Sequence, residues 1–192
     1  MIPWIQLDSA KTPDGQQELR LKRRGSEFSI MLGTNELMNS RLSGSEEALA
    51  RLSCQRIAGH LQPRVLIGGL GMGFTLRAAL AELGNNAEIV VAELMPAVVA
   101  WARGPMAEIF TGSLDDPRVT IREADVGQLI RSESAAWDAI LLDVDNGPKA
   151  SSTRAMTPST AWQGSAPRVP PSSRAACWRC GRKARMPASR GG

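Results

Sequence analysis

The sequence has little of what marks membrane, secreted or metal-binding proteins. No apolar run approaches the roughly 18 residues that a membrane-spanning helix needs. The N-terminus has no basic start followed by an apolar block, so we expect no secretory signal. The three cysteines, at positions 54, 177 and 180, make no disulfide framework, and their single C-x-x-C pair lacks the second pair of ligands that zinc needs. We therefore expect a cytoplasmic location, no membrane partner and no metal.

Basic residues are distributed unevenly along the 192 residues. The formal net charge is +4, yet residues 151–192 hold seven Arg, one Lys and no acid, a charge of +8. Residues 1–150 therefore sum to −4. Because the basic balance comes from the tail alone, we expect no nucleic-acid partner for the folded part.

Residues 1–45 predict a small β-rich segment. Residues 18–22 alternate between apolar and polar side chains, and residues 28–32 form a largely apolar run. The turn cluster Arg24-Gly25-Ser26 separates them, which is typical of a β-hairpin.

Residues 46–150 alternate short apolar strands with helices, which favours an α/β fold with a doubly wound, mostly parallel Rossmann-like sheet. The expected strands are 65–67, 89–91, 119–121 and 139–142, and the expected helices begin near residue 46 and span 74–83, 97–102 and 126–131.

Glycines cluster where the first of these strands meets its helix. Gly68, Gly69, Gly71 and Gly73 lack a Cβ, so a ligand can approach the backbone closely, and the helix start offers unpaired N–H groups. A tight turn without a ligand is the alternative. The G-x-G-x-G spacing lacks the last glycine of the dinucleotide fingerprint, because position 74 is Phe. The spacing therefore favours a nucleoside that carries a sulfonium over NAD.

Carboxylates follow the next three strands. Glu93 can accept hydrogen bonds from both hydroxyls of a ribose, or it is a solvated surface acid. Asp125 can accept a bond from an adenine amino group, or it caps the helix after it. Asp143 can act as a base or orient an amine, whereas a metal loop is a poorer interpretation because too few oxygen ligands surround it.

These four signals stand at the ends of four successive strands and together resemble the class I AdoMet-dependent transferases. Within that group, residues 15–148 are most similar to the spermidine synthase family. Residues 115–118 followed by Asp125 are similar to its D-P-R…D segment, and residues 137–143 to its segment with the catalytic aspartate. A β-rich part before the glycine loop also fits that family.

The resemblance implies a transferase that uses AdoMet or decarboxylated AdoMet as donor. It implies transfer of an aminopropyl or methyl group to a small-molecule amine, and it is compatible with a homodimer. It further implies that residues 68–73 hold the methionine portion of the donor, Glu93 its ribose and Asp125 its adenine. Asp143 is then the catalytic aspartate and part of the donor site.

The chain departs from the family pattern at two places. The family loop reads G-G-G-D-G, with an Asp that holds the aminopropyl amine, where this chain has Gly71-Met72. The family also uses a Tyr-His-Glu stretch and further tyrosines near the acceptor, whereas this chain has no Tyr and has Ser45-Glu46-Glu47 there. A non-catalytic or truncated nucleoside-binding descendant is therefore the alternative to an enzyme. An NAD-linked oxidoreductase is a weaker alternative because of Phe74.

Residues 151–192 are not typical of the end of such a domain, because they contain no Leu, Ile or Phe. Such a segment cannot bury enough apolar surface to offset its ordering entropy. The codons of this segment can also be read in the frame that starts at the third base of each codon. In that frame Met156-Thr157 must encode Asp and Cys177-Trp178 must encode Leu. The same frame permits an apolar helix, a turn and an apolar strand. We interpret the segment as an irregular, non-native basic tail after a frameshift near residues 148–150, with a natural disordered tail as the alternative. The sheet is then expected to be incomplete, with an unpaired edge.

Overall fold

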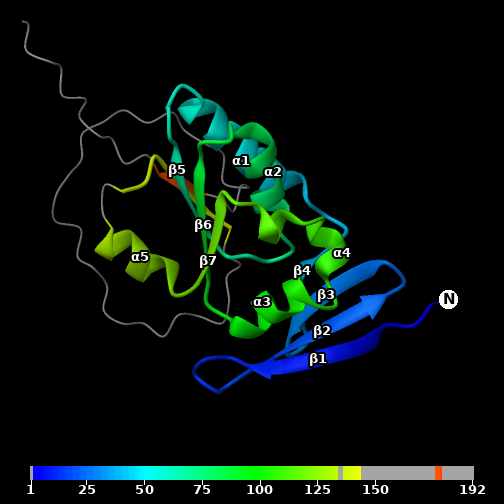
Figure 1. Cartoon of the computed structure of the whole chain (residues 1–192). Coiled ribbons are helices and arrows are strands. Elements are labelled where there is room, and N and C mark those ends of the chain that lie inside the picture. Colours follow the sequence, from blue (N-terminus) through cyan, green and yellow to red (C-terminus); the bar gives the residue numbers. More distant parts are fainter. Residues whose placement is uncertain (1, 134–135, 144–175, 179–192) are drawn as a thin grey trace, which may run out of the picture.

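The computed structural model describes residues 2–133, 136–143 and 176–178, which form two β-sheets and the helices around them (Figure 1). The first sheet is antiparallel, with the strand order β1-β2-β3-β4. Its strands are β1 (Ile5–Lys11), β2 (Glu18–Arg24), β3 (Glu27–Leu32) and β4 (Asn35–Asn39).

The predicted hairpin is formed by β2 and β3. Its two-residue turn has Gly25 at the first central position with φ +60°, the conformation that a type II′ turn requires there. On β2, Leu19 and Leu21 are buried while the residues between and after them are half-exposed, so the period-2 pattern of the sequence correctly indicated the buried face.

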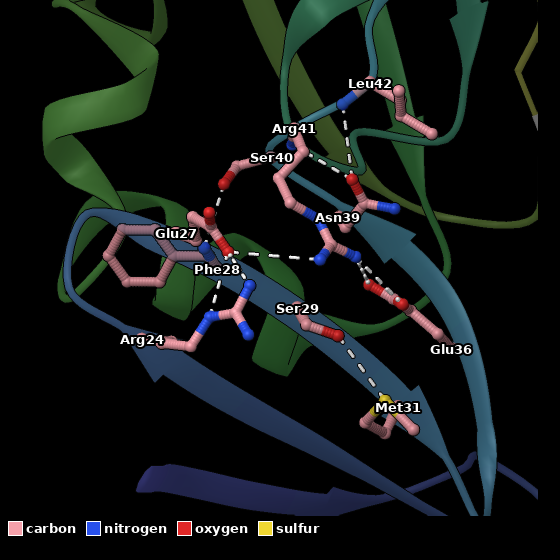
Figure 2. Close-up of polar contacts among 10 residues, drawn as sticks. All are labelled: Arg24, Glu27, Phe28, Ser29, Met31, Glu36, Asn39, Ser40, Arg41 and Leu42. Atoms are coloured by element: carbon pink, nitrogen blue, oxygen red, sulfur yellow. Dashed lines mark hydrogen bonds and ion pairs between the residues drawn. The ribbon is translucent and has the colours of Figure 1, made fainter. Parts of the chain in front are cut away.

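Charged side chains join this hairpin to the end of β4 (Figure 2). Arg41 donates from Nη2 to both carboxylate oxygens of Glu36, at 3.1 and 3.2 Å, and its Nη1 lies 3.9 Å from Glu27. Glu27 also accepts two hydrogen bonds from Arg24, whose guanidinium stacks over the ring of Trp4. Partly exposed pairs are individually weak, but this network orients the chain where it leaves the first sheet.

The second sheet has the order β7-β6-β5-β8-β9, and its first four strands are parallel, as predicted for a doubly wound fold. β6 and β7 lie on one side of β5 and β8 on the other, which creates a topological switch point between β5 and β8. The strands are β5 (Arg64–Gly68), β6 (Glu88–Glu93), β7 (Val119–Glu123), β8 (Ala139–Leu142) and β9 (Ala176–Trp178). The helices are α1 (Gly44–Ile57), α2 (Phe74–Glu82), α3 (Pro96–Arg103), α4 (Ala107–Phe110) and α5 (Val126–Ser132), and a 3-10 turn, η1, spans Ser113–Asp115.

Successive side chains of the central strands face two different cores. Val65 and Ile67 of β5 enter a large core, whereas Leu66 enters a smaller one that includes Trp137. Figure 1 shows α1 and α2 on one face of the sheet and α5 on the other.

The large core also contains side chains of the first sheet, including Phe28 and Ile30, so the two sheets share one hydrophobic interior. Trp101 of α3 is buried there, and its Nε1 donates a hydrogen bond to Asp8 of β1 at 2.6 Å. This bond lowers the pKa of the Asp8 carboxyl.

The predicted site of the frameshift and most of the tail lie outside the described residues. β9 is the described part of the tail, and it pairs antiparallel with β8, Leu141 opposite Cys177. The expectation of an irregular tail and an unpaired sheet edge therefore differs from the structure at these three residues. Within the described ranges, none of the helices has the length and apolar character to cross a bilayer.

Candidate functional site

The glycine loop turns the chain from β5 into α2 at the switch point. Gly69, Gly71 and Gly73 have φ values of +89°, +51° and +75°, in the region that costs other residues about 1–2 kcal/mol each. The amide of Gly69 donates to the carbonyl of Ala92 at 2.8 Å, which ties the start of the loop to β6. The loop conformation itself therefore favours glycine at these three positions.

Two of the glycines also have neighbouring side chains that a Cβ would crowd. A Cβ on Gly73 would lie 2.4 Å from the ring of Phe110, and a Cβ on Gly68 would lie 2.9 Å from the side chain of Leu142. Packing within the protein thus accounts for Gly68 and Gly73. Close approach of a ligand stays a prediction for this loop.

Glu93 is the last residue of β6 and is only 8% exposed, so its interpretation as a solvated surface acid is wrong. Its Oε2 accepts a hydrogen bond from the amide of Leu70 at 2.9 Å, and its Oε1 accepts one from the amide of Met95 at 2.8 Å. A carboxylate has about four lone-pair positions, so each oxygen can accept one bond more. Glu93 therefore holds the glycine loop against β6, and its bond to a ribose remains a prediction.

Asp143 directly follows β8, next to the first glycine of the loop. Its amide donates to the carbonyl of Gly68 at 2.9 Å, which continues the pairing of β5 with β8 by one residue. Its Oδ2 accepts a hydrogen bond from Oγ1 of Thr75 at 2.6 Å. Thr75 was not among the residues predicted from the sequence, although its place in the first turn after the glycine loop was a signal that could have indicated it.

Asp125 caps α5, as one of the two sequence interpretations predicted. Its Oδ1 accepts a hydrogen bond from the amide of Gln128 at 2.9 Å. The residue before it, Ala124, donates its amide to the carbonyl of Glu93 at 2.9 Å, so the ends of β6 and β7 are adjacent. The cap does not test the predicted contact of Asp125 with adenine.

The D-P-R segment has a structural role at the other end of α2. Arg118 donates to both oxygens of Asp116, at 2.8 and 2.9 Å, and from Nη1 to the carbonyls of Leu80 at 3.2 Å and Leu83 at 2.8 Å. These carbonyls belong to the last turn of the helix, where a cation is favourable. The bonds from Arg118 lower the pKa of Asp116 to about 2, and the carboxylate of Asp116 in turn raises the pKa of Arg118.

Met72 occupies the place of the family's amine-holding Asp. Its side chain is 4% exposed and belongs to the large core, so no charge is present at this position of the loop. In the part of the chain that the structure describes, no group of three or more His, Cys, Asp and Glu side chains could hold a metal ion. A surface hollow on the first sheet, lined by Ile2, Ile5 and Leu7 among others, includes none of the predicted site residues.

The glycine loop follows β5, Glu93 ends β6 and Asp143 follows β8 on a doubly wound sheet, an arrangement that resembles the Rossmann-like fold of the class I AdoMet-dependent transferases. No family model matches the chain. The chain resembles the spermidine synthase-like family in both sequence and structure. It is 34% identical over 95 residues to a polyamine aminopropyltransferase of Synechococcus sp., covering 47% of this chain and 30% of the relative. It is 36% identical over 89 residues to polyamine aminopropyltransferase 1 of Streptomyces coelicolor, covering 45% of this chain and 17% of the relative.

Two solved structures share the fold. The spermidine synthase of Thermotoga maritima superposes with a TM-score of 0.60 at 19% identity, over 74% of this chain and 48% of that one. A spermidine synthase in complex with the transition-state analogue AdoDATO superposes with a TM-score of 0.58 at 20% identity, over 73% and 47%. The predicted resemblance and the predicted fold are confirmed. The chain matches less than a third of the length of these two curated relatives.

Proposed function

We propose that the chain is a spermidine synthase-like transferase that binds AdoMet or decarboxylated AdoMet and alkylates a small-molecule amine. The observation that supports this best is the position of Glu93 and Asp143. Glu93 ends β6 and Asp143 directly follows β8. The side chain of Glu93 is hydrogen-bonded to Leu70 of the glycine loop, and that of Asp143 to Thr75 in the first turn of α2. In open α/β sheets, ligands bind beyond the carboxyl ends of the strands at such a switch point. The curated relatives named as polyamine aminopropyltransferases support the same reaction.

In the proposed reaction the donor supplies a carbon atom bonded to a sulfonium. The lone pair of the amine nitrogen forms the new N–C bond, the C–S bond breaks, and its electron pair stays on sulfur as a neutral thioether. The amine then carries an extra proton, which Asp143 accepts or directs to water. Glu93 and the loop backbone align the donor, so that the reacting atoms meet in line.

The donor is proposed to be AdoMet rather than its decarboxylated form. A carboxylate in the glycine loop would attract the donor's ammonium and repel the carboxylate that only AdoMet carries, whereas the buried thioether of Met72 does neither. In competition calorimetry AdoMet should therefore bind more tightly. Met72→Asp should move the preference toward the decarboxylated form, with thermal unfolding as the check that this variant folds. A preference of the unaltered chain for the decarboxylated donor would contradict the proposal.

The second candidate is a nucleoside-binding descendant that has lost catalysis. The observations that favour it are the apolar Met72 and the absence of Tyr from the whole chain. Calorimetry with AdoMet, decarboxylated AdoMet and NAD, followed by product analysis with a panel of amines, separates the candidates. Binding of a sulfonium nucleoside without any thioether product would favour this descendant, and binding of NAD alone would overturn both candidates.

The remaining parts of the proposal concern organisation. We propose a β-rich segment at 1–45, a donor-binding domain at 46–150 and a non-native tail at 151–192, in a cytoplasmic protein. A homodimer and the lack of a nucleic-acid partner stay predictions, which light scattering and electrophoretic binding assays can test.

A further inference from the structure

Thr75 is a buried hydroxyl residue that reaches from one element to the candidate catalytic residue of another. It lies in the first turn of α2 and is 2% exposed. Its Oγ1 donates to Oδ2 of Asp143 at 2.6 Å, across 68 residues of sequence. The bond therefore connects the helix after the glycine loop to the end of β8.

The local structure restricts the directions that this hydroxyl can take. Thr is branched at Cβ, so its χ1 angle is restricted in a helix. The helix itself is held at both ends, by the loop that contains Gly73 at its start and by Arg118 at its last carbonyls. Because the hydroxyl is buried, leaving it unpaired would be costly, so the bond to Asp143 is favoured over an exchange with water.

The backbone and side chain of Asp143 are then held by different elements. Its amide is bonded to Gly68 of β5 and its side chain to Thr75 of α2. Fixing one carboxylate oxygen and the backbone determines the plane of the carboxylate, and therefore the direction in which it meets a substrate.

We propose that Thr75 is the positioning residue for Asp143, holding its carboxylate in a fixed orientation toward the amine acceptor. This role rests on the proposed function. It goes beyond that function because it assigns Thr75 a part in the reaction that it plays only through Asp143. Thr75 need not touch either substrate.

The kinetic test compares three variants of the full chain. Thr75→Val keeps the shape and removes the donor, Thr75→Ser keeps the donor, and Thr120→Val is the control at an exposed position of β7. Thr75→Val should lower kcat about tenfold or more, the effect of losing one hydrogen bond in the transition state, with donor KM nearly unchanged. Thr75→Ser and Thr120→Val should stay close to the unaltered chain. A double-mutant cycle adds Asp143→Asn to these variants. In the Asp143→Asn background, Thr75→Val should cause no further loss of kcat. If the losses from Thr75→Val and Asp143→Asn are additive in the double variant, the proposal is overturned.

A second measurement does not depend on activity. The chemical shift of the Asp143 carboxyl carbon is followed by carbon-13 NMR as a function of pH. Its signal is assigned as the one that is missing from the spectrum of Asp143→Asn. A hydrogen bond to a carboxylate favours its charged form, so Thr75→Val should raise the midpoint of this titration, and Thr75→Ser should not. An unchanged midpoint in Thr75→Val overturns the positioning role even if the chain proves to be an active transferase. A raised midpoint with no donor binding would leave the bond established and refute the proposed function instead.

Discussion

Gly73→Ala tests whether the glycine loop is fixed by packing against Phe110. Two costs add at this position. The backbone angle of +75° costs about 1–2 kcal/mol for alanine. The new Cβ would lie 2.4 and 2.6 Å from two ring atoms of Phe110, and overpacking of this kind costs about 1–3 kcal/mol. The expected loss of about 2–5 kcal/mol is a large share of the roughly 5–15 kcal/mol that stabilises a typical domain.

Gly71→Ala is the matched control in the same loop. Its φ of +51° imposes the same kind of backbone cost, but the nearest atom to its Cβ is the sulfur of Met38 at 3.5 Å, an ordinary contact. We therefore expect a loss of about 1–2 kcal/mol from Gly71→Ala. The difference between the two variants isolates the contact with Phe110.

Urea unfolding followed by tryptophan fluorescence measures both variants, because Trp101 and Trp137 are buried in the two cores. Adding Phe110→Leu to Gly73→Ala should recover part of the loss, since the smaller side chain makes room for the methyl group. Equal losses in the two alanine variants, or strict additivity with Phe110→Leu, would refute the packing argument.

Three further predictions concern the site, its support and the tail. Glu93→Ala should weaken nucleoside binding by about 1.5–3 kcal/mol, the value of a hydrogen bond to a charged group, and unchanged affinity in calorimetry would remove Glu93 from the site. The folded-state pKa of Asp116 is about 2, below its ordinary value of 3.8, so the stability from its bonds to Arg118 is present above about pH 4 and is lost as the pH falls toward 2. After solvent screening this amounts to about 1 kcal/mol, and Asp116→Asn should remove that part of the acid dependence of unfolding. Restoring the reading frame in the tail should raise the unfolding temperature, and a gene whose native frame is uninterrupted at codons 145–155 would end that interpretation.

The alternation of strands and helices was predictable because each element carries its pattern within a few residues. The end of β6 and the end of β8 followed from apolar runs that stop at Glu93 and Asp143. α4 and η1 were not predicted, because the segment after α3 buries single residues such as Met106 and Phe110 without a sustained helical period.

The supporting contacts of the site were not predictable, because each joins residues far apart in the sequence. Phe110 explains Gly73 only once the fold brings the ring to the loop. The hydroxyl of Thr75 donates a hydrogen bond to Asp143, 68 residues later in the sequence. The side chain of Asp138 accepts a hydrogen bond from the amide of Arg64, 74 residues earlier. His60, whose side chain is 45% exposed, lies with its Nδ1 3.0 Å from Oδ1 of the same carboxylate of Asp138. Local patterns carry no record of such pairings.

The interior shared by the two sheets has a consequence for cooperativity and for protein engineering. Phe28 and Ile30 of the first sheet are fully buried in the same core as Leu76 and Ala79 of α2, and Trp101 bonds to Asp8 across the junction. Cutting the chain between Asn39 and Gly44 would expose to water the apolar faces that the two parts bury against each other in this core. The natural break in the sequence pattern near residue 45 is therefore a change of architecture and not a place where the protein can be divided. The first sheet and the parallel sheet should therefore unfold in one cooperative transition.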